Sequence, residues 1–318
     1  MAGEGILSGQ LLLLPPLAIE RRWLPHEDRR KAGGVTGVDG RWSDMPIQLI
    51  GFLLVAPALA IVLLLFIVPL VSSVTGAFDV GGSVGLGNFT KAFELYSGDM
   101  LFTLVIVLLS SALIGLFSIM IGGYLTLGTN ARAVAILRWI YRWPLFIPFI
   151  VVGQILRTFL AKNGLMNNIF IELGLMTPAA AMSFLDWRGI VVAFVWKQTP
   201  FVTLLLAGAM ASIDQSTIEA ARNLGARRVR ILIEIVLPQV RQTLLVGLIL
   251  SFVTMMSVLS VPLMINAQSP TMITANMAFR INAHGDYGVA NALGLISLLM
   301  TSVAAMVYLR QTVREHSR

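Results

Sequence analysis

The chain has 318 residues, of which 57% are hydrophobic and only 12% are charged. Soluble domains carry about a quarter charged residues, so this composition excludes an ordinary soluble domain and indicates an integral membrane protein. The chain has no cysteine, which excludes disulfides and thiolate metal sites, and its three histidines are far apart in sequence, so no metal site is expected.

Residues 1–46 are expected to form a cytoplasmic N-terminal tail. Their apolar run at 6–19 is broken by Pro15 and Pro16 and is too short to cross a bilayer. A signal peptide is not expected, because the basic residues follow the apolar run instead of preceding it. The alternative is a misassigned start codon.

Six apolar runs of about 20 residues follow, which is the length a helix needs to cross the hydrocarbon layer. The fold class predicted is therefore an all-α integral membrane protein whose transmembrane domain occupies residues 47–312, followed by a short cytoplasmic tail at 313–318. Prolines inside these runs are tolerated because neighbouring helices, hydroxyls or water can pair with the freed carbonyls. The predicted spans are 47–75, 101–128, 140–161, 189–212, 242–265 and 288–309.

The basic residues predict the orientation, because cytoplasmic loops of membrane proteins are enriched in Lys and Arg. Most of the 23 Lys and Arg residues lie before the first span, between spans two and three, between spans four and five, or at the C-terminal end. Both termini are therefore expected in the cytoplasm. The topology also explains the net charge of +7, so no nucleic-acid partner is expected.

The polar stretch at 213–238, between spans four and five, is predicted to fold as helix, turn and helix. Asp214 or Ser216 can cap the first helix, and Ser216 with Glu219 has the spacing of a capping box. Gly225 can end that helix in the left-handed conformation. Leu237-Pro238 is expected to stop or kink the second helix. The alternative is a solvated loop whose arginines only set the orientation.

Polar side chains within the spans are candidates for lining a solute path, because such groups are costly in lipid and tend to face the interior. In the alternative, the two cations reach toward the interface and the amides bond neighbouring helices. The candidates are Gln154, Arg157, Lys197, Gln198, Asn266 and Asn291.

The stretch at 219–238 resembles the EAA signature of permease subunits of binding-protein-dependent ABC importers. Glu219-Ala220-Ala221, Gly225, Ile235 and Leu237-Pro238 stand at the spacings of that signature, and Leu224 departs from it where many members have Asp. Other stretches resemble elements of sugar permeases. They are GLGNF at 85–89, GLMN at 164–167 with LGL at 173–175, WKQTP at 196–200 and YGVANAL at 287–293.

This resemblance, which covers roughly residues 48–312, implies the six-helix fold of a type I ABC importer permease in the bacterial inner membrane. The stretch at 219–238 would be a coupling helix that docks on one of two ATPase subunits. The chain lacks a P-loop sequence, so it is expected to be non-catalytic, with no cofactor of its own, and ATP and Mg would be bound by the ATPases. The other implied partners are the lipid bilayer, an extracytoplasmic solute-binding protein and a second permease, with a heterodimer favoured.

The sugar-permease elements favour a carbohydrate as the solute. Permeases for polyamines, phosphate esters or ferric ions share much of this frame and are the alternatives. An ion-coupled secondary transporter is a further alternative, disfavoured by the lack of a clear internal repeat. An intramembrane enzyme is disfavoured because Asp and Glu are nearly absent from the predicted spans.

Overall fold

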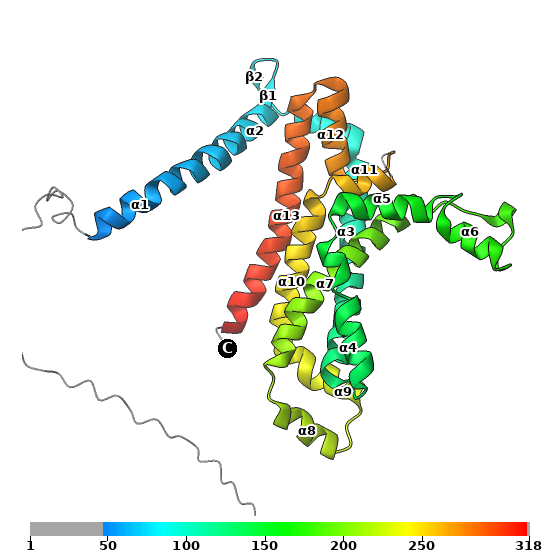
Figure 1. The fold of residues 1–318 in the computed structure, drawn as a ribbon. Coiled ribbons are helices and arrows are strands. Elements are labelled where there is room, and N and C mark those ends of the chain that lie inside the picture. Colours follow the sequence, from blue (N-terminus) through cyan, green and yellow to red (C-terminus); the bar gives the residue numbers. More distant parts are fainter. Residues whose placement is uncertain (1–46, 267, 317–318) are drawn as a thin grey trace, which may run out of the picture. The chain divides into compact units, whose positions relative to one another are not determined.

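The computed structural model describes residues 47–266 and 268–316 (Figure 1). The tail predicted at 1–46 and the last two residues of the predicted C-terminal tail lie outside this part. The chain divides into two compact units, Met1–Ile61 and Val62–Arg318. The described part of the first unit is helical and belongs to α1 (Ile47–Val62).

The second unit is built almost entirely of helices, with one short β-hairpin. Its first elements are the π-helical turn η1 (Leu63–Ile67), α2 (Val68–Phe78), β1 (Asp79–Val80), β2 (Ser83–Val84), α3 (Gly87–Leu127) and α4 (Ala131–Ile140). The next are η2 (Trp143–Phe146), α5 (Phe149–Leu160), α6 (Leu165–Glu172), η3 (Pro178–Ala180), α7 (Trp187–Ala211) and α8 (Gln215–Asn223). The last are α9 (Arg228–Ile231), η4 (Leu232–Val236), α10 (Leu237–Ser257), α11 (Ser260–Ile265), α12 (Ile273–His284) and α13 (Tyr287–His316).

Among the described residues, five helices are long and apolar enough to cross a membrane, and a bent helix pair brings the number to six if the pair counts as one span. The five are Leu54–Phe78, Gly87–Leu127, Trp187–Ala211, Arg228–Ser257 and Tyr287–Met306, and the bent pair is Ala131–Phe146 with Phe149–Glu172. This agrees with the predicted all-α membrane class. The longest of these helices, α3, has 41 residues and begins at Gly87, well before the span predicted at 101–128.

The third span was wrongly predicted as one continuous helix at 140–161. The helices on either side of its break are bent by 105°. Ile147 has an extended backbone with ψ of 122°, as expected for a residue before proline, and Pro148 is extended as well with ψ of 148°. Pro148 therefore ends the first half of the span and caps α5.

The fifth span was wrongly predicted to continue as one helix to residue 265. Its helix runs over Arg228–Ser257, and the chain becomes extended at Val258 with ψ of 122°. A continuous helix would bring the ring of Pro262 against the carbonyl of Val258, four residues earlier. The chain instead breaks there and restarts as the short helix α11.

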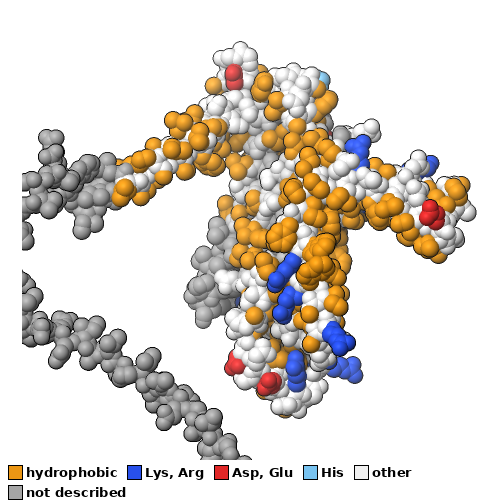
Figure 2. All heavy atoms as spheres, viewed as in Figure 1, with side chains coloured by type: hydrophobic (Ala, Val, Ile, Leu, Met, Phe, Trp, Pro, Cys, Tyr) orange, Lys and Arg blue, Asp and Glu red, His pale blue; other side chains and the backbone are white. Residues whose placement is uncertain are grey.

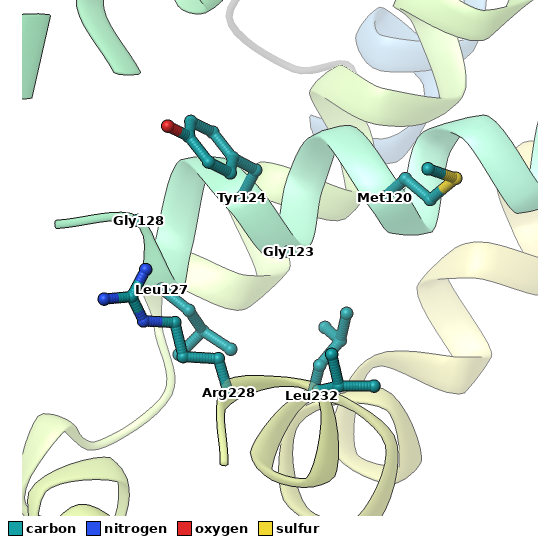
Figure 3. Close-up of a pocket in the computed structure, with 8 residues that line it drawn as sticks. Met120, Gly123, Tyr124, Leu127, Gly128, Arg228 and Leu232 are labelled. Carbon is teal, nitrogen blue, oxygen red and sulfur yellow. The ribbon is translucent and has the colours of Figure 1, made fainter. Parts of the chain in front are cut away.

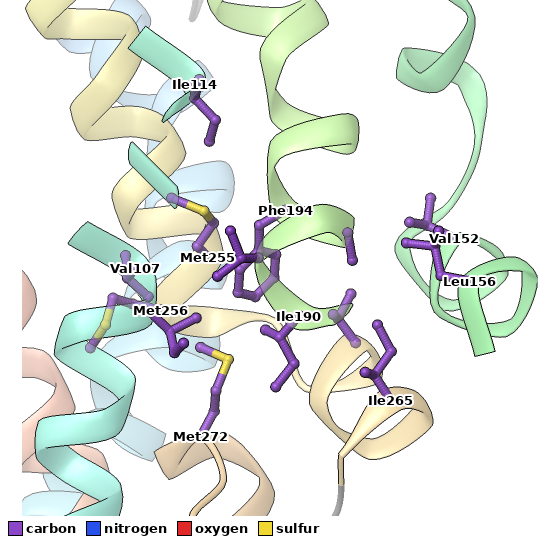
Figure 4. Packing of buried hydrophobic residues seen from close by; sticks show 14 of the residues in the cluster. Val107, Ile114, Val152, Leu156, Ile190, Phe194, Met255, Met256, Ile265 and Met272 are labelled. Carbon is purple, nitrogen blue, oxygen red and sulfur yellow. The ribbon is translucent and has the colours of Figure 1, made fainter. Parts of the chain in front are cut away.

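The largest core of the second unit lies where α3, α5, α7, α10 and α11 meet. Ile190 and Phe194 of α7 and Met255 of α10 are fully buried in it, together with Val107 of α3 (Figure 4). Lipid tails are as apolar as these side chains, so such helices are held together by close van der Waals packing and not by the hydrophobic effect. This packing holds α3 and α7 side by side and so positions the segment that follows α7.

Two of the short sequence motifs meet at the end of the unit where α2 finishes and α13 begins. The side-chain amide of Asn88, in the GLGNF stretch, donates to the carbonyls of Ala77 and Asp79. A Cβ on Gly288, in the YGVANAL stretch, would lie 2.7 Å from Asn88 Nδ2. Glycine at position 288 therefore allows α13 to approach Asn88, and the two motifs contact each other.

Candidate functional site

The connecting segment (residues 213–238) begins with α8, at the end of the bundle where α7 finishes (Figure 1). Asp214 caps the helix, because its carboxylate accepts the amide of Ser216 at 2.9 Å and the hydroxyl of Ser216 at 2.7 Å. These bonds hold the pKa of Asp214 below its ordinary value. Of the two predicted caps, Asp214 is therefore the correct one. The capping box of Ser216 and Glu219 is wrong, since Ser216 lies inside the helix.

Gly225 ends α8 as predicted. Its φ is +80°, in the left-handed region that favours glycine. The Gly225 amide donates to the Arg222 carbonyl at 2.9 Å, and the Ala226 amide donates to the Ala221 carbonyl at 3.0 Å. These two bonds form a Schellman motif, which pairs the last carbonyls of α8 and fixes the direction in which the chain leaves.

Two fully buried isoleucines anchor the connecting segment to the bundle. Ile218 of α8 and Ile231 of α9 have no exposed surface, and both pack in a cluster with Leu206 and Met210 of α7. Ala221 and Ile235 pack against the same cluster, so two of the predicted coupling residues are brought together. The segment is therefore a packed extension of the spans and not a solvated loop.

The opposite face of α8 is open. Glu219 and Ala220 are exposed, and Leu224 at the end of the helix is 89% exposed. Because Ala220 has only a methyl group, another surface can come close to the helix backbone there. The segment thus combines a buried anchoring face with a small-residue face that the described residues leave uncovered.

The second half of the connecting segment continues without interruption into the fifth span. The predicted stop or kink at Leu237-Pro238 is wrong, because α9, η4 and α10 form one helix of 30 residues. A π-helical turn absorbs the proline: the Leu237 amide donates to Leu232, five residues earlier. This wider turn shifts the hydrogen-bond register just before Pro238, which lacks an N–H and would otherwise break the ladder.

A pocket of about 310 Å³ separates this helix from the end of α3 (Figure 3). Arg228 closes one side of it and donates to the hydroxyl of Thr129 at 3.0 Å. Leu232 approaches α3 at Gly123, where a Cβ would lie 2.6 Å from its side chain. The Leu232 side chain of η4 therefore packs directly against α3 at Gly123, where a larger residue would force the leucine to shift.

Lys197 was predicted to line a solute path, or to reach toward the interface. Lys197 lies within α7, ten residues from its start, and is only 9% exposed. Its ammonium donates to the carbonyls of Pro144 and Leu145 at 2.8 and 3.0 Å and lies 5.5 Å from the ring centre of Phe149. Lys197 therefore ties α7 to the carbonyls of η2, just before the break in the third span.

The other path candidates lie in different elements. Gln198, next to Lys197, is buried, whereas Gln154 of α5 is exposed. Asn291 of α13 accepts the hydroxyl of Ser73 in α2 at 2.9 Å, so this amide does join neighbouring helices. Their role in solute passage stays a prediction. The last two candidates are Asn266, whose amide donates to the Pro270 carbonyl at 3.1 Å, and Arg157, which donates to the Met264 carbonyl at 3.2 Å.

Sequence reasoning missed Asp99, a carboxylate buried in α3. Its Oδ1 accepts the amide of Thr271 at 2.8 Å and the hydroxyl of Ser269 at 3.1 Å. One turn later, Thr103 accepts the amide of Ile273 at 3.0 Å. Asp99 therefore holds the loop between α11 and α12 against α3. The available signal was its position: Asp99 is a charged residue just before the span predicted at 101–128.

Among the described residues, no group of three or more His, Cys, Asp or Glu side chains could hold a metal ion. The connecting segment is an anchored helix with one open face, followed by a second helix that is continuous with a span.

Residues 114–315 match the family described as binding-protein-dependent transport system inner membrane component. This match covers more than half of the chain, including all of α7 to α12 and the whole connecting segment.

Individual proteins give the same picture. The chain is 26% identical over 295 residues to the sulfoquinovosyl glycerol transport system permease protein SmoG of Agrobacterium fabrum, covering 85% of this chain and 92% of that protein. It is 29% identical over 287 residues to the trehalose/maltose transport system permease protein MalF of Thermococcus litoralis, covering 82% and 92%. A chain in the crystal structure of a bacterial alginate ABC transporter, in complex with an alginate pentasaccharide-bound periplasmic protein, shares its fold. That comparison has a TM-score of 0.73 and 20% identity and covers 87% of this chain and 98% of that one.

Proposed function

The chain belongs to the family of binding-protein-dependent transport system inner membrane components, and on this premise we propose that it is the permease subunit of an ATP-driven carbohydrate importer. As a multi-pass inner-membrane permease it is not itself the catalyst of ATP hydrolysis. The carbohydrate assignment is supported by the relatives that carry sulfoquinovosyl glycerol and trehalose or maltose in their names.

The observation that carries the coupling role is the two-faced α8. Its buried face, through Ile218, is packed on the end of α7, and its exposed face presents Glu219, Ala220 and Leu224. A helix transmits the movement of a bound partner only if its own ends are fixed. The Asp214 cap fixes the start of α8, and in our proposal the exposed face docks in a cleft of the ATPase.

The partners follow from this role. Two ATPase subunits bind ATP and Mg, an extracytoplasmic binding protein delivers the solute, and a second, non-identical permease completes the membrane part. Both termini and the connecting segment lie in the cytoplasm in this arrangement. Basic residues in the connecting segment and between spans two and three support that orientation, because cytoplasmic loops are enriched in Arg and Lys. They are Arg138, Arg142, Arg222, Arg227 and Arg228.

The test is Ala220→Trp in the assembled transporter. A bulky ring at this exposed position leaves the buried face of α8 untouched but obstructs a docking partner. We expect the protein to insert in the membrane normally, the ATPase to be lost on co-purification, and solute uptake to fall to background. Ala179→Trp is the matched control. Ala179 is also exposed, but it lies in η3, which precedes the N-terminal end of α7, whereas α8 follows the C-terminal end.

Full ATPase co-purification and uptake with Ala220→Trp would contradict the docking role. Loss of the ATPase with Ala179→Trp as well would show that the ring disturbs assembly from any position. The solute class is tested separately, by a thermal-shift screen of carbohydrates, polyamines, phosphate esters and ferric ion on the cognate binding protein. Stabilisation by a non-carbohydrate alone would overturn the substrate assignment and leave the coupling role standing.

A further inference from the structure

Two arginines one helical turn apart, Arg138 and Arg142, stand between two hollows of the surface. One hollow, of about 490 Å³, lies between α3, α4 and α7 and is lined by Leu125, Thr126 and Leu204 as well as the arginines. The other, also about 490 Å³, lies along α4 and η2. Both arginines line both hollows and are exposed. They are therefore accessible from two sides.

The second hollow has aromatic walls. Trp139 and Trp143 line it and touch edge to face, with ring centres 4.6 Å apart. Phe146 continues this wall and is 81% exposed. Figure 2 shows hydrophobic side chains beside the Lys and Arg side chains in this region of α4. A cationic group next to a long exposed apolar wall matches a ligand with an anionic head and apolar chains.

The charges of the two arginines are not balanced locally. None of the residues that line the two hollows is acidic. Arg142 donates to the hydroxyl of Tyr141 at 3.2 Å and lies over its ring, and both of these contacts are with a neutral partner. Arg138 lies near the end of α4 and Arg142 lies in the turn that follows, and like charges that line the same hollows repel each other. A bound anion between them would convert this repulsion into two favourable contacts.

The uncharged stretch of α3 indicates that the site lies near the boundary of the hydrocarbon layer. Leu125 and Thr126, which line the first hollow, belong to the last turn of α3, at the end of its uncharged stretch at 100–127. Tryptophan is enriched at this level of the membrane, and basic pockets between helices on the cytoplasmic side bind anionic lipid head groups.

We propose that Arg138 and Arg142 bind the phosphate of an anionic phospholipid of the cytoplasmic leaflet, whose acyl chains lie along Trp139, Trp143 and Phe146. The inference rests on the proposed orientation, with α4 at the cytoplasmic side. The lipid would brace the break of the third span, because η2 and the turn after Phe146 directly follow the arginines. The first hollow reaches Gln215 at the start of α8, but Glu219, Ala220 and Leu224, which carry the coupling role, line neither hollow.

The experiment is native mass spectrometry of the assembled transporter with phosphatidylglycerol and phosphatidylcholine of matched chains. We expect preferential retention of phosphatidylglycerol, weakened about fivefold in Arg138→Gln and in Arg142→Gln. Arg132→Gln is the matched control: Arg132 lies in the same helix and is exposed, but it lines neither hollow. Arg138→Lys keeps the charge and is expected to keep most of the preference.

Equal retention of the two lipids by the wild type, or an equal loss in Arg132→Gln and Arg138→Gln, would overturn the proposal. So would full displacement of phosphatidylglycerol by inorganic phosphate, which would identify a site for a free anion. Each spectrum also reports whether the ATPase subunits are present. A transporter that retains its ATPases without lipid preference refutes this site alone, whereas loss of the ATPases in the wild type refutes the proposed assembly.

Discussion

Replacement of Lys197 by Met tests whether the buried ammonium stabilises the break in the third span. Methionine is similar in length and fills the same space, but it cannot donate a hydrogen bond. The change therefore removes the two bonds from Lys197 to the carbonyls of Pro144 and Leu145 while leaving the packing of α7 largely intact.

The geometry sets the size of the effect. Hydrogen bonds from a charged donor contribute about 1.5–3 kcal/mol each, so the two bonds set an upper limit of about 3–6 kcal/mol. The Pro144 carbonyl keeps the Ile147 amide, at 3.3 Å, and is not left unpaired. Methionine also removes the cost of burying a charge. We therefore expect Lys197→Met to lower the free energy of unfolding by about 2–4 kcal/mol.

The assay is equilibrium unfolding of the purified chain by SDS in mixed micelles, followed by circular dichroism, with solute uptake measured in parallel. Lys162→Met is the control, because Lys162 is exposed in the loop after α5. Lys197→Arg keeps the positive charge and is expected to lose less stability than Lys197→Met. An unfolding free energy of Lys197→Met within about 1 kcal/mol of the wild type would refute the reasoning. Normal stability with lost uptake would instead favour the predicted path-lining role.

Three further outcomes are expected. Gly225→Ala places a side chain at a φ of +80°, so it should lower the free energy of unfolding by about 1–2 kcal/mol and weaken ATPase retention. Gly98→Ala, in open space within α3, should not destabilise the protein. Equal unfolding curves of the two variants would contradict this reasoning. Hydrogen bonds from Ser216 lower the pKa of Asp214 below 3.8, so its stabilisation of α8 is full above pH 3.8 and is lost only as the pH falls through the lowered value. Hydrogen exchange of α8 checks this, and a loss of protection already between pH 7 and 5 would contradict it. Asp99→Leu leaves the buried Thr271 amide without its acceptor, so thermal unfolding should show a free energy of unfolding lower by about 1–3 kcal/mol. Asp99→Asn should lose less stability. Equal losses in the two variants would show that the acceptor is unimportant.

The local features of the connecting segment could be predicted because their causes are local. The φ of Gly225 and the cap by Asp214 depend on a few neighbouring residues, and those residues are visible in the sequence. The capping box was wrong because two competent caps stand two residues apart, and the first of them began the helix earlier. The continuation through Pro238 was not predictable, since a π-helical turn leaves no distinct sequence pattern.

The break in the third span and the role of Lys197 depend on contacts between distant parts of the chain. Residues 140–161 are apolar enough for a span, and hydropathy does not distinguish a straight helix from a bent one. Proline within a span is compatible with a continuous helix when neighbouring groups pair with the freed carbonyl, but Pro148 lies at the break between two helices. The partner carbonyls of Lys197 lie more than 50 residues away, so no local pattern indicated that its ammonium would be buried.

The length of α3 has a mechanical consequence. Its 41 residues, with no proline among them, form one rod of about 60 Å, about twice the thickness of the hydrocarbon layer. Lys91, near one end, pairs with Asp286 before α13, and Gly123, near the other end, receives Leu232. Such a rod works as a lever: a tilt of about 10° moves one end by about 10 Å relative to the other. Under the proposed function, a small rotation of the helix that carries Leu232 would therefore be enlarged at the Lys91 end of α3.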